Sequence, residues 1–454
     1  MTDTFWCEAA WLGGDSATQR VLITVQHGLI SGIQVGVDCP PNAVRLAGLT
    51  IPGLANAHSH AFHRALRSRT HHGEGTFWTW RDQMYAVAER LDPDLYHDLA
   101  IAVFGEMALA GITCVGEFHY LHHDVGGTPY SNPNAMSEAL IDAAGVVGIR
   151  LTMLDTCYLE GAPGQALNPL QTRFSDGSFH QWAERVSGYS LPNFARLGGA
   201  AHSVRAVPPE ELRSMAEWGR SNEAVLHAHV SEQPAENEQC RAAYGLTPVG
   251  VLAREGVLAP NFTAVHATHL TPDDIALLGA NETNICMCPT TERDLADGVG
   301  PAAALRAANA ALCVGSDSHA VIDLFEEARA IELDERLVTL KRGNHRAVAL
   351  LEAATVNGHR SLGWADAGRI VEGFRADFVS VRADSVRTAG TATGWMVEMA
   401  VYAATAADID TVVCDGKVVV SGGAHRHLDV GRELARSIAQ VFGEKPGFGS
   451  GSQQ

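Results

Sequence analysis

Two histidines that follow an apolar run near the N-terminus have the spacing of metal ligands. His58 and His60 end the segment 51–60. A β-strand turns residues i and i+2 to the same side, so both imidazoles can face one ion. The same arrangement returns at His227 and His229, which follow an apolar run of their own. Paired imidazoles at the ends of two strands predict a metal centre with hydrolytic chemistry.

His266 and Asp317 each close a further apolar run. A single histidine at a strand end is more often an ordinary core residue than a ligand, but four such ends in one chain favour a shared site. We expect the metal ligands to be His58, His60, His229 and Asp317. Three imidazoles and one carboxylate suit a catalytic Zn²⁺ with an open position for water. Fe²⁺ and Mn²⁺ accept the same ligand types.

The number of ions depends on what could bridge two of them. Hydrolytic enzymes that hold two metal ions in a barrel of parallel strands join the ions through a carboxylated lysine or, in some cases, a carboxylate. The chain has no lysine before Lys341, which excludes a lysine bridge and leaves Asp155 as an alternative. We therefore expect one divalent ion per chain. His229 is preferred to His227 because Glu232 follows it by one turn, and His227 is expected to be structural.

A single-metal site needs side chains that move protons. A bound metal ion lowers the pKa of water toward neutrality, and Asp317 can accept the proton that the water releases. Glu232 can then deliver a proton to a nitrogen leaving group as a general acid. His266 is expected to orient the water or to stabilise charge that develops in the transition state. His269, in the same segment, is expected to lie in a loop.

Strand-like runs alternate with helical patterns in the middle of the chain. The expected strands end near Asn56, Glu117, Asp155, Ser203, His229, His266, Cys288 and Ser316. The expected helices span residues 95–110, 134–147, 209–220, 247–255, 271–278 and 301–308. This alternation predicts an α/β fold, a (β/α)₈ TIM-like barrel, with the ligand-bearing strand ends on one face. A doubly wound open sheet is the alternative, but it gives no reason for four such ends to surround one axis.

Both ends of the chain have the pattern of short strands separated by glycine and proline. The expected strands include residues 21–25 and 28–33, a strand–turn–strand unit at 368–379, and a hairpin with an Asp-Gly turn at 410–420. We expect residues 1–50 and 365–430 to form a small β-sandwich domain, and residues 51–364 to form the barrel. Residues 431–454 are expected to form a C-terminal helix and a disordered tail, which begins at Gly447.

Composition excludes several classes of partner. The 454 residues are 46% hydrophobic and 19% charged, and the net charge is −19. This charge argues against nucleic acid and anionic membranes, and an anionic substrate would need a local cluster of arginines. The N-terminus lacks the pattern of a signal peptide, and no run of about 18 apolar residues predicts a membrane span. The nine cysteines include no CxxC pair, so we expect a reduced, cytoplasmic protein.

Several motifs resemble those of the amidohydrolase superfamily, in its single-metal deaminase branch. The Pro-Gly-x-x-Asn-x-His-x-His pattern at 52–60 and the Gly-x-x-x-x-Gly-x-x-Ala-Asp pattern at 368–377 carry this resemblance, which covers nearly the whole chain. Within the branch the chain is most similar to the N-formimidoyl-L-glutamate deiminases of histidine degradation. The segments that carry this likeness are 58–62, 77–81, 116–123, 202–205, 229–233 and 315–319.

The resemblance implies a substrate pocket and an activity. Arg81, Tyr120, His202 and Arg205 would contact the substrate. His63 stands where that family is expected to have glutamine, so this contact either differs or is supplied by the histidine as a donor. The implied reaction converts N-formimidoyl-L-glutamate and water to N-formyl-L-glutamate and ammonia. Barrels of this type often dimerise, so a homodimer is expected.

Two arginines agree with a small dicarboxylate substrate on chemical grounds. A guanidinium group binds a carboxylate through two parallel hydrogen bonds. Arg173 and Arg293 are the alternatives if Arg81 and Arg205 prove to be ordinary ion-pair residues. Two other functions stay open. Deamination of a purine, pterin or related ring would favour stacking aromatic residues, and a non-catalytic barrel scaffold would usually have lost its ligands.

Overall fold

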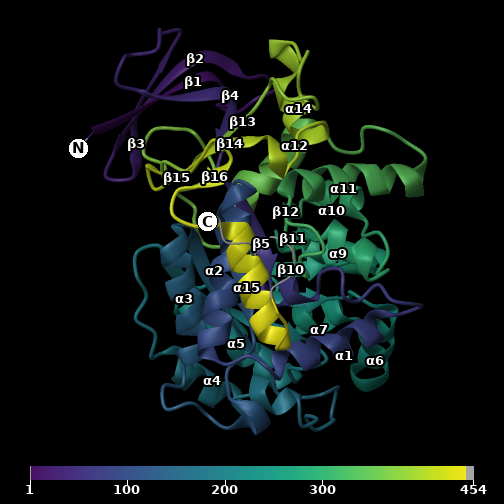
Figure 1. The fold of residues 1–454 in the computed structure, drawn as a ribbon. Helices are drawn as coiled ribbons and strands as arrows, with labels where there is room; N and C mark the ends of the chain where they lie inside the picture. Colours follow the sequence, from purple (N-terminus) through teal and green to yellow (C-terminus); the bar gives the residue numbers. More distant parts are fainter. Residues whose placement is uncertain (1, 446–454) are drawn as a thin grey trace.

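Parallel strands in the middle of the chain form a closed barrel (Figure 1). The computed structural model describes residues 2–445. The barrel strands are β5 (Leu54–Ser59), β6 (Ile112–His119), β7 (Arg150–Cys157), β8 (Ala195–Ser203), β9 (Leu226–Val230), β10 (Phe262–His266), β11 (Asn284–Met287) and β12 (Ala311–Val314). Each strand pairs in parallel with its neighbour in the chain, and a parallel bridge between Ser59 and Asp317 joins the last strand to the first. The predicted (β/α)₈ barrel is therefore confirmed.

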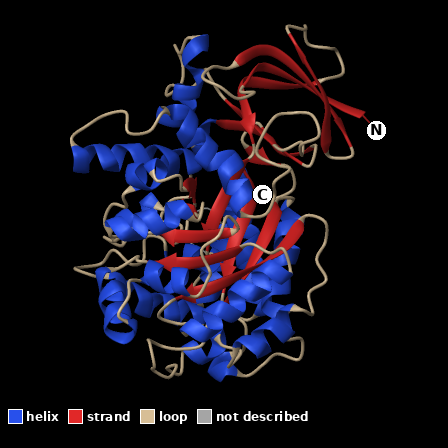
Figure 2. Cartoon of the chain, turned by 180° about the vertical axis from the view of Figure 1, so that it is seen from behind, coloured by secondary structure: helices blue, strands red, loops and turns tan. Residues whose placement is uncertain are grey.

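Most helices surround the barrel on its outside, as Figure 2 shows. The α-helices of the described residues are α1 (Phe77–Ala88), α2 (Pro93–Leu109), α3 (Ala135–Val147), α4 (Phe179–Val186), α5 (Pro209–Ser221), α6 (Pro234–Tyr244), α7 (Pro248–Arg254), α8 (Pro272–Ala280), α9 (Pro289–Asp294), α10 (Ala302–Ala307), α11 (Leu324–Thr339), α12 (Ala347–Glu352), α13 (Gly358–Ser361), α14 (Met396–Tyr402) and α15 (Val430–Phe442). Of these, α14 packs against α11 and α12 beside the second sheet (Figure 1). The predicted helices correspond to α2, α3, α5, α7, α8 and α10. Local chemistry sets where they start: before α8, Thr271 and Asp274 form a reciprocal capping box.

A separate sheet is built from both ends of the chain (Figure 1). Its strands are β1 (Thr2–Ala10), β2 (Thr18–Gln26), β3 (Leu29–Val35), β4 (Val44–Pro52), β13 (Phe378–Val381), β14 (Ile409–Cys414), β15 (Lys417–Ser421) and β16 (Ala424–His425). β4 pairs with β13, and this contact joins the N-terminal strands to the C-terminal ones. Phe5, Ile23, Leu46, Phe378 and Val413 form the buried core on one face of the sheet. The prediction of a separate β unit from both termini is confirmed, and its residue limits stay a prediction.

Two local predictions near the C-terminus have different outcomes. The Asp-Gly hairpin forms between β14 and β15, where Asp415 and Gly416 have φ of 54° and 74°, as a tight two-residue turn requires. The strand predicted from 368 is wrong, because Gly368 and Gly373 have φ of 81° and 86° and interrupt the extended run. Helix α15 begins where the C-terminal helix was expected, and the tail from Gly447 lies outside the described residues.

The barrel strands are buried on both faces, which explains why their sequences read as continuous apolar runs. β5, β6 and β7 are buried along their whole length. Because barrel strands converge at their carboxyl ends, the polar residues that close these runs meet on one face. Within residues 2–445, no helix has the length and apolar character needed to cross a membrane.

Candidate active site

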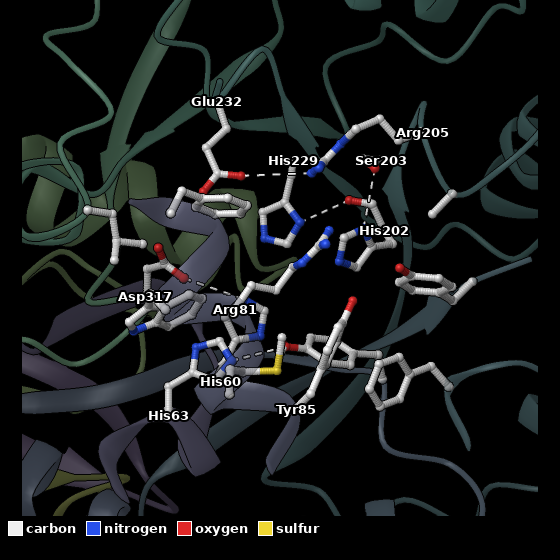
Figure 3. Close-up of a pocket in the computed structure, with 18 of the residues that line it drawn as sticks. His60, His63, Arg81, Tyr85, His202, Ser203, Arg205, His229, Glu232 and Asp317 are labelled. Atoms are coloured by element: carbon white, nitrogen blue, oxygen red, sulfur yellow. Dashed lines mark hydrogen bonds and ion pairs between the residues drawn. The ribbon is translucent and has the colours of Figure 1, made fainter. Parts of the chain in front are cut away.

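Side chains from four barrel strands converge at the carboxyl-terminal face. His58 and His60 come from the end of β5, His229 from β9, His266 from β10, and Asp317 from the loop after β12. The Nε2 atoms of His58 and His60 lie 3.3 and 3.4 Å from Asp317 Oδ1, and His229 Nε2 lies 3.2 Å from His58 Nε2. The structure therefore brings the predicted metal ligands together, and Figure 3 shows three of them around one cavity.

Hydrogen bonds from the outer ring nitrogens fix how two imidazoles face the centre. His60 Nδ1 donates to the carbonyl of Phe118 at 2.8 Å, and His229 Nδ1 donates to the carbonyl of His202 at 2.9 Å. Each ring is left with an unprotonated Nε2 directed at the centre. Burial, followed by the nearby His58, lowers the pKa of His60 to about 3, so this imidazole is neutral at neutral pH. Neutral imidazoles are the form that binds metal ions.

The donor set fits a divalent cation. Burial alone would raise the pKa of Asp317, but the hydrogen bond with His58 and the neighbouring imidazoles hold it below its usual value. The ionised carboxylate and the Nε2 lone pair of His60 therefore face each other at 3.4 Å with no proton between them. Two acceptors this close repel each other unless a cation lies among them. Imidazole nitrogens and one carboxylate oxygen are the ligand types of catalytic zinc.

His266 stands beside these ligands. Its ring stacks on that of His229, with the centroids 5.6 Å apart and the planes inclined by 15°. His266 Nε2 lies 3.8 Å from both Glu232 Oε1 and Asp317 Oδ2, and Nδ1 lies 3.5 Å from Glu292 Oε1. Burial disfavours the charged ring, but these carboxylates raise the pKa of His266 well above its usual value. His266 can therefore donate a hydrogen bond toward a reacting group.

Two other groupings at this centre do not follow from the sequence. Ligand atoms of His58, His229 and His266 lie within 4.8 Å of one another, as do those of His266, Cys288 and Asp317. Cys288 is buried after β11, and burial raises the pKa of its thiol to about 12. The sequence marks Cys288 only as a strand end, because a buried thiol in an apolar run resembles any small core residue.

Glu232 has the position and the protonation state of a proton carrier. It follows β9 and is 6% exposed. Its Oε1 faces His266, and its Oε2 lies 4.0 Å from the guanidinium group of Arg205. Burial raises the pKa of Glu232 to about 7, while His266 and Arg205 oppose that shift. A carboxyl group with a pKa near neutrality can both accept and donate a proton at the working pH.

The predicted substrate contacts line one cavity next to the ligands (Figure 3). Its empty volume is about 690 Å³, part of it open to solvent. Its polar lining is formed by His60, His63, Arg81, Tyr120, His202, Ser203, Arg205, His229, Glu232, His266 and Asp317. Its aromatic and apolar lining is formed by Phe77, Trp80, Met84, Tyr85, Tyr158, Phe174, Ala206 and Leu295. The cavity therefore combines three of the four predicted metal ligands, the predicted proton carrier and every predicted substrate contact.

Two guanidinium groups in this cavity have N–H groups without partners. Arg81 Nε and Arg205 Nε are buried, and neither forms a hydrogen bond to the part of the chain that the structure describes. Arg81 stacks over Trp78 and Tyr85, with its guanidinium carbon 4.5 and 5.5 Å from the ring centroids. In Figure 3 both guanidinium groups point into the cavity beside His202. The cavity thus presents cationic donors that a ligand could satisfy.

His63 pairs with Tyr120 in the wall of the cavity. His63 Nε2 lies 3.0 Å from the Tyr120 hydroxyl, and the ring packs on that of His60 at 4.5 Å between centroids. Burial lowers the pKa of His63 well below its usual value, so the ring is neutral. Its Nδ1 is buried without a partner among residues 2–445.

The alternative candidates have structural contacts. Asp155 forms a buried ion pair with Arg185 at 2.7 Å, so it does not bridge metal ions. Arg173 donates to backbone carbonyls, and Arg293 pairs with Asp334 at 2.8 Å outside the cavity. As expected, the other two histidines bond to backbone rather than to the cluster: His227 Nε2 lies 3.0 Å from the carbonyl of Ser361, and His269 Nε2 lies 2.8 Å from the carbonyl of Asp297.

Part of the cavity wall comes from a helix that the sequence analysis missed. Trp80, Met84 and Tyr85 lie on α1 with Arg81, and all line the cavity. The helical spacing of residues 77, 80, 81, 84 and 85 is the signal that could have shown them to share one face.

Comparison with known proteins identifies relatives along nearly the whole length. The amidohydrolase family model matches residues 49–419. Formimidoylglutamate deiminase from Pseudomonas aeruginosa is 33% identical over 417 residues, which cover 88% of this chain and 90% of that protein. 5-Methylthioadenosine/S-adenosylhomocysteine deaminase from Pelotomaculum thermopropionicum is 29% identical, covering 86% of this chain and 84% of that protein.

Solved structures of similar proteins have the same fold. The crystal structure of an amidohydrolase from Brucella melitensis superposes with a TM-score of 0.88 at 30% identity, covering 97% of this chain and 100% of that one. The crystal structure of an adenosine deaminase from Xanthomonas campestris, with bound zinc, gives a TM-score of 0.82 at 22% identity, covering 96% of this chain and 97% of that one.

Proposed function

This chain belongs to the amidohydrolase family, and from this premise we propose that it hydrolyses N-formimidoyl-L-glutamate to N-formyl-L-glutamate and ammonia. The family and its deaminating relatives make the chain a hydrolase that acts on C–N bonds, so a non-catalytic scaffold is excluded. The observation that carries the choice of substrate is the pair of guanidinium groups, on Arg81 and Arg205, with free N–H groups in the cavity.

A dicarboxylate complements the positive charge of the cavity better than a neutral ring does. Each guanidinium can form a charge-assisted, two-bonded pair with a carboxylate. A neutral ligand would bury Arg81 and leave its buried Nε–H unpaired, which costs about 1–3 kcal/mol for each unsatisfied group. Arg81 has no carboxylate partner among residues 2–445, so it is available to an anionic ligand.

The ligand cluster supplies the reaction with its metal centre. His58, His60, His229 and Asp317 would hold one divalent ion, and their nitrogen and oxygen donors favour zinc. A zinc ion in such a site activates water near neutral pH and polarises the group that the water attacks. The outer hydrogen bonds of His60 and His229 keep both rings oriented for this purpose.

Protons move between residues that the cavity places together. As water adds to the formimidoyl carbon, Asp317 accepts one of its protons and Glu232 protonates the imine nitrogen. Glu232 then takes the proton of the new hydroxyl group, and Asp317 passes its proton to the same nitrogen. The carbon–nitrogen bond breaks, the nitrogen leaves as ammonia, and the carbon–oxygen bond becomes the formyl carbonyl, with both carboxyl groups back in their starting state. The leaving nitrogen thus gains two protons, and the water loses two. His266, 3.8 Å from both carboxylates, donates toward the developing negative charge.

The remaining cavity residues would hold the glutamate portion. Arg81 and Arg205 would each bind one carboxylate, and Tyr120 and His202 would add hydrogen bonds. His63 would donate through its unpartnered Nδ1 while Nε2 keeps its contact with Tyr120. The histidine can in this way replace the glutamine expected at that position.

A purine deaminase is the second candidate. The relative from Pelotomaculum thermopropionicum that is named for 5-methylthioadenosine and S-adenosylhomocysteine covers most of the chain, and aromatic side chains line the same cavity. Trp80, Tyr85 and Phe174 could stack on a ring. The free cationic donors of Arg81 and Arg205 weigh against 5-methylthioadenosine and other uncharged nucleosides, which offer no anionic partner, whereas S-adenosylhomocysteine would offer a single carboxylate.

Ammonia release from a substrate panel separates the two candidates. The zinc-loaded protein would be tested with N-formimidoyl-L-glutamate, N-formimidoylglycine, 5-methylthioadenosine and adenosine. We expect turnover of the dicarboxylate far above that of the others. Preferred turnover of a nucleoside would contradict the proposal and leave only the deaminase class. A role in histidine degradation, a cytoplasmic location and a homodimer stay predictions.

A further inference from the structure

The barrel closes at a joint that carries few backbone hydrogen bonds. Between β5 and β12 the described residues form one parallel bridge, Ser59 with Asp317. His60 N donates to the carbonyl of Asp317 at 3.3 Å, and Asp317 N donates to the carbonyl of His58 at 3.0 Å. Gly315 permits this approach, because a Cβ there would lie 2.7 Å from the Cβ of His58. Ligands on both sides of the joint thus depend on how its two strands are held.

The backbone at this joint is also strained. Asp317 and His319 have φ of 40° and 60°, a region that residues with a Cβ adopt only at an energetic cost. Such a conformation persists only where the surroundings fix it. The position of the Asp317 carboxylate therefore needs support from side chains.

A buried chain of hydrogen bonds crosses the joint. Asn56 Nδ2 donates to Ser316 Oγ at 2.7 Å, and Ser316 Oγ lies 3.0 Å from His319 Nδ1. His319 Nε2 lies 3.2 Å from Ser59 Oγ, and Ser59 Oγ donates to Glu117 Oε2 at 2.5 Å. All five residues are fully buried. This hydrogen-bond chain runs from β5 to the loop after β12, back to β5, and on to β6.

The residues at the two ends of this hydrogen-bond chain fix the direction in which its members donate. Asn56 Oδ1 accepts the Ser316 N–H at 2.9 Å, so its Nδ2 must be the donor toward Ser316 Oγ. At the other end Glu117 accepts from Ser59 Oγ and, at 2.6 Å, from the Ala61 N–H. Both contacts come from donors, so Glu117 is the accepting end of the hydrogen-bond chain.

One proton arrangement satisfies every member between these ends. Ser316 accepts from Asn56 and donates to His319 Nδ1, and Ser59 accepts from His319 Nε2 and donates to Glu117. The imidazole of His319 is then neutral, with its proton on Nε2, an assignment that follows from the network.

We propose that this directed hydrogen-bond chain, Asn56–Ser316–His319–Ser59–Glu117, positions His58, His60 and Asp317 for the metal ion. Its members are positioning residues, because the chain acts through the backbone of the ligands it flanks. Ser59 lies between His58 and His60 in sequence, and Ser316 and His319 flank Asp317. The inference rests on the proposed metal site and is independent of the substrate.

Exchanging the two ends tests the direction of the chain. Glu117→Gln presents an amide N–H donor to the Ser59 hydroxyl. The hydrogen-bond chain then has a donor at each end, at Asn56 and at position 117, so one hydroxyl proton between them has no acceptor. Asn56→Asp alone presents acceptors at both ends, which only a doubly protonated His319 beside the cation site could satisfy. Together the substitutions reverse every bond, because the new amide at position 117 donates to Ser59 and the new carboxylate at position 56 accepts from Ser316. A residue change that is harmful alone is therefore expected to rescue the other.

The experiment measures how fast zinc-loaded protein loses its ion to a chelator, with the visible spectrum of cobalt-substituted protein as a second readout of ligand geometry. Glu117→Gln should lose zinc about 10- to 100-fold faster than the wild type, as expected for lost outer hydrogen bonds. The double variant should return to within a few-fold of the wild type. Ser361→Ala removes a buried hydroxyl that bonds to Gly358 away from the site, and should match the wild type.

The possible results separate this inference from the proposed function. Wild-type loss rates for Glu117→Gln, or a double variant that loses zinc as fast as Glu117→Gln or faster, would overturn the directed chain. If the double variant fails to fold, Ser59→Ala decides: it should lose zinc faster than Ser361→Ala, and equal rates would overturn the inference. Wild-type protein that binds no divalent ion would instead contradict the proposed metal site.

Discussion

Replacing Arg81 with alanine tests how the substrate is held. Arg81 stacks on Trp78 and Tyr85, and among residues 2–445 its buried Nε has no partner and its guanidinium group forms no ion pair with the predicted metal ligands. The substitution therefore removes a substrate contact and leaves the proton carrier in place. Arg205→Ala is less clean, because Arg205 lies 4.0 Å from Glu232 and opposes the rise in its pKa.

Loss of one partner from a buried, hydrogen-bonded charge pair costs about 2–4 kcal/mol here, toward the lower part of the usual range because the cavity is partly open. At about 1.36 kcal/mol per tenfold change, kcat/KM for N-formimidoyl-L-glutamate should fall about 30- to 900-fold. Arg81→Lys should fall between alanine and the wild type, because it keeps the charge and loses the two-bonded geometry.

The assay compares ammonia release from the dicarboxylate with release from two analogues, one lacking the α-carboxylate and one lacking the side-chain carboxylate. Arg81→Ala should lower kcat/KM for only one of the two analogues, and Arg205→Ala for only the other. Removing an arginine costs nothing further when the carboxylate that it binds is already missing from the analogue. Arg293→Ala is the matched control, since that arginine is paired with Asp334 outside the cavity. Normal turnover of the dicarboxylate by both cavity variants would refute the reasoning, as would equal losses on both analogues.

Other substitutions and conditions test the chemistry. Glu232→Gln should keep the metal ion and lose about 10²- to 10⁴-fold in kcat, measured alongside metal content; metal-loaded variant with near wild-type kcat would remove Glu232 from the proton path. Asp317→Asn should lose more of both its metal ion and its kcat than Glu232→Gln does, because it lacks a charged ligand and the proton acceptor for water. Since Glu232 has a pKa of about 7 and acts when protonated, the acid form is lost as pH rises, so wild-type kcat/KM should fall above about pH 7. The residual activity of Glu232→Gln should lack this fall. Elemental analysis should find one divalent ion per chain, and two ions both needed for activity would contradict the single-metal site.

Much of the candidate ligand cluster could be predicted from the sequence, because strand geometry acts locally. The period of two in a strand places His58 and His60 on one side. A barrel brings its strand ends together independently of the loop conformations. The same logic placed Asp317 and His229 at the centre, where their atoms now lie within ion-pair or hydrogen-bond distance of His58.

The parts that could not be predicted depend on packing between distant segments. Glu117 could be read as a strand end, but its contact with Ser59 exists only because β6 pairs with β5. Helix α11 was missed because its buried face contains charged residues, including Glu327 and Glu332, so the apolar period of a helix is obscured. The stacking of His266 on His229 likewise follows from strand pairing, which brings β9 against β10.

The products of a single turnover test the central claim most directly. Zinc-loaded protein would be mixed with N-formimidoyl-L-glutamate, and each product would be quantified. The proposed reaction predicts one ammonia and one N-formyl-L-glutamate for each substrate consumed, with activity lost on removing the metal and regained on adding it back. Formamide and glutamate would show that the other C–N bond is cleaved, and that result would contradict the account.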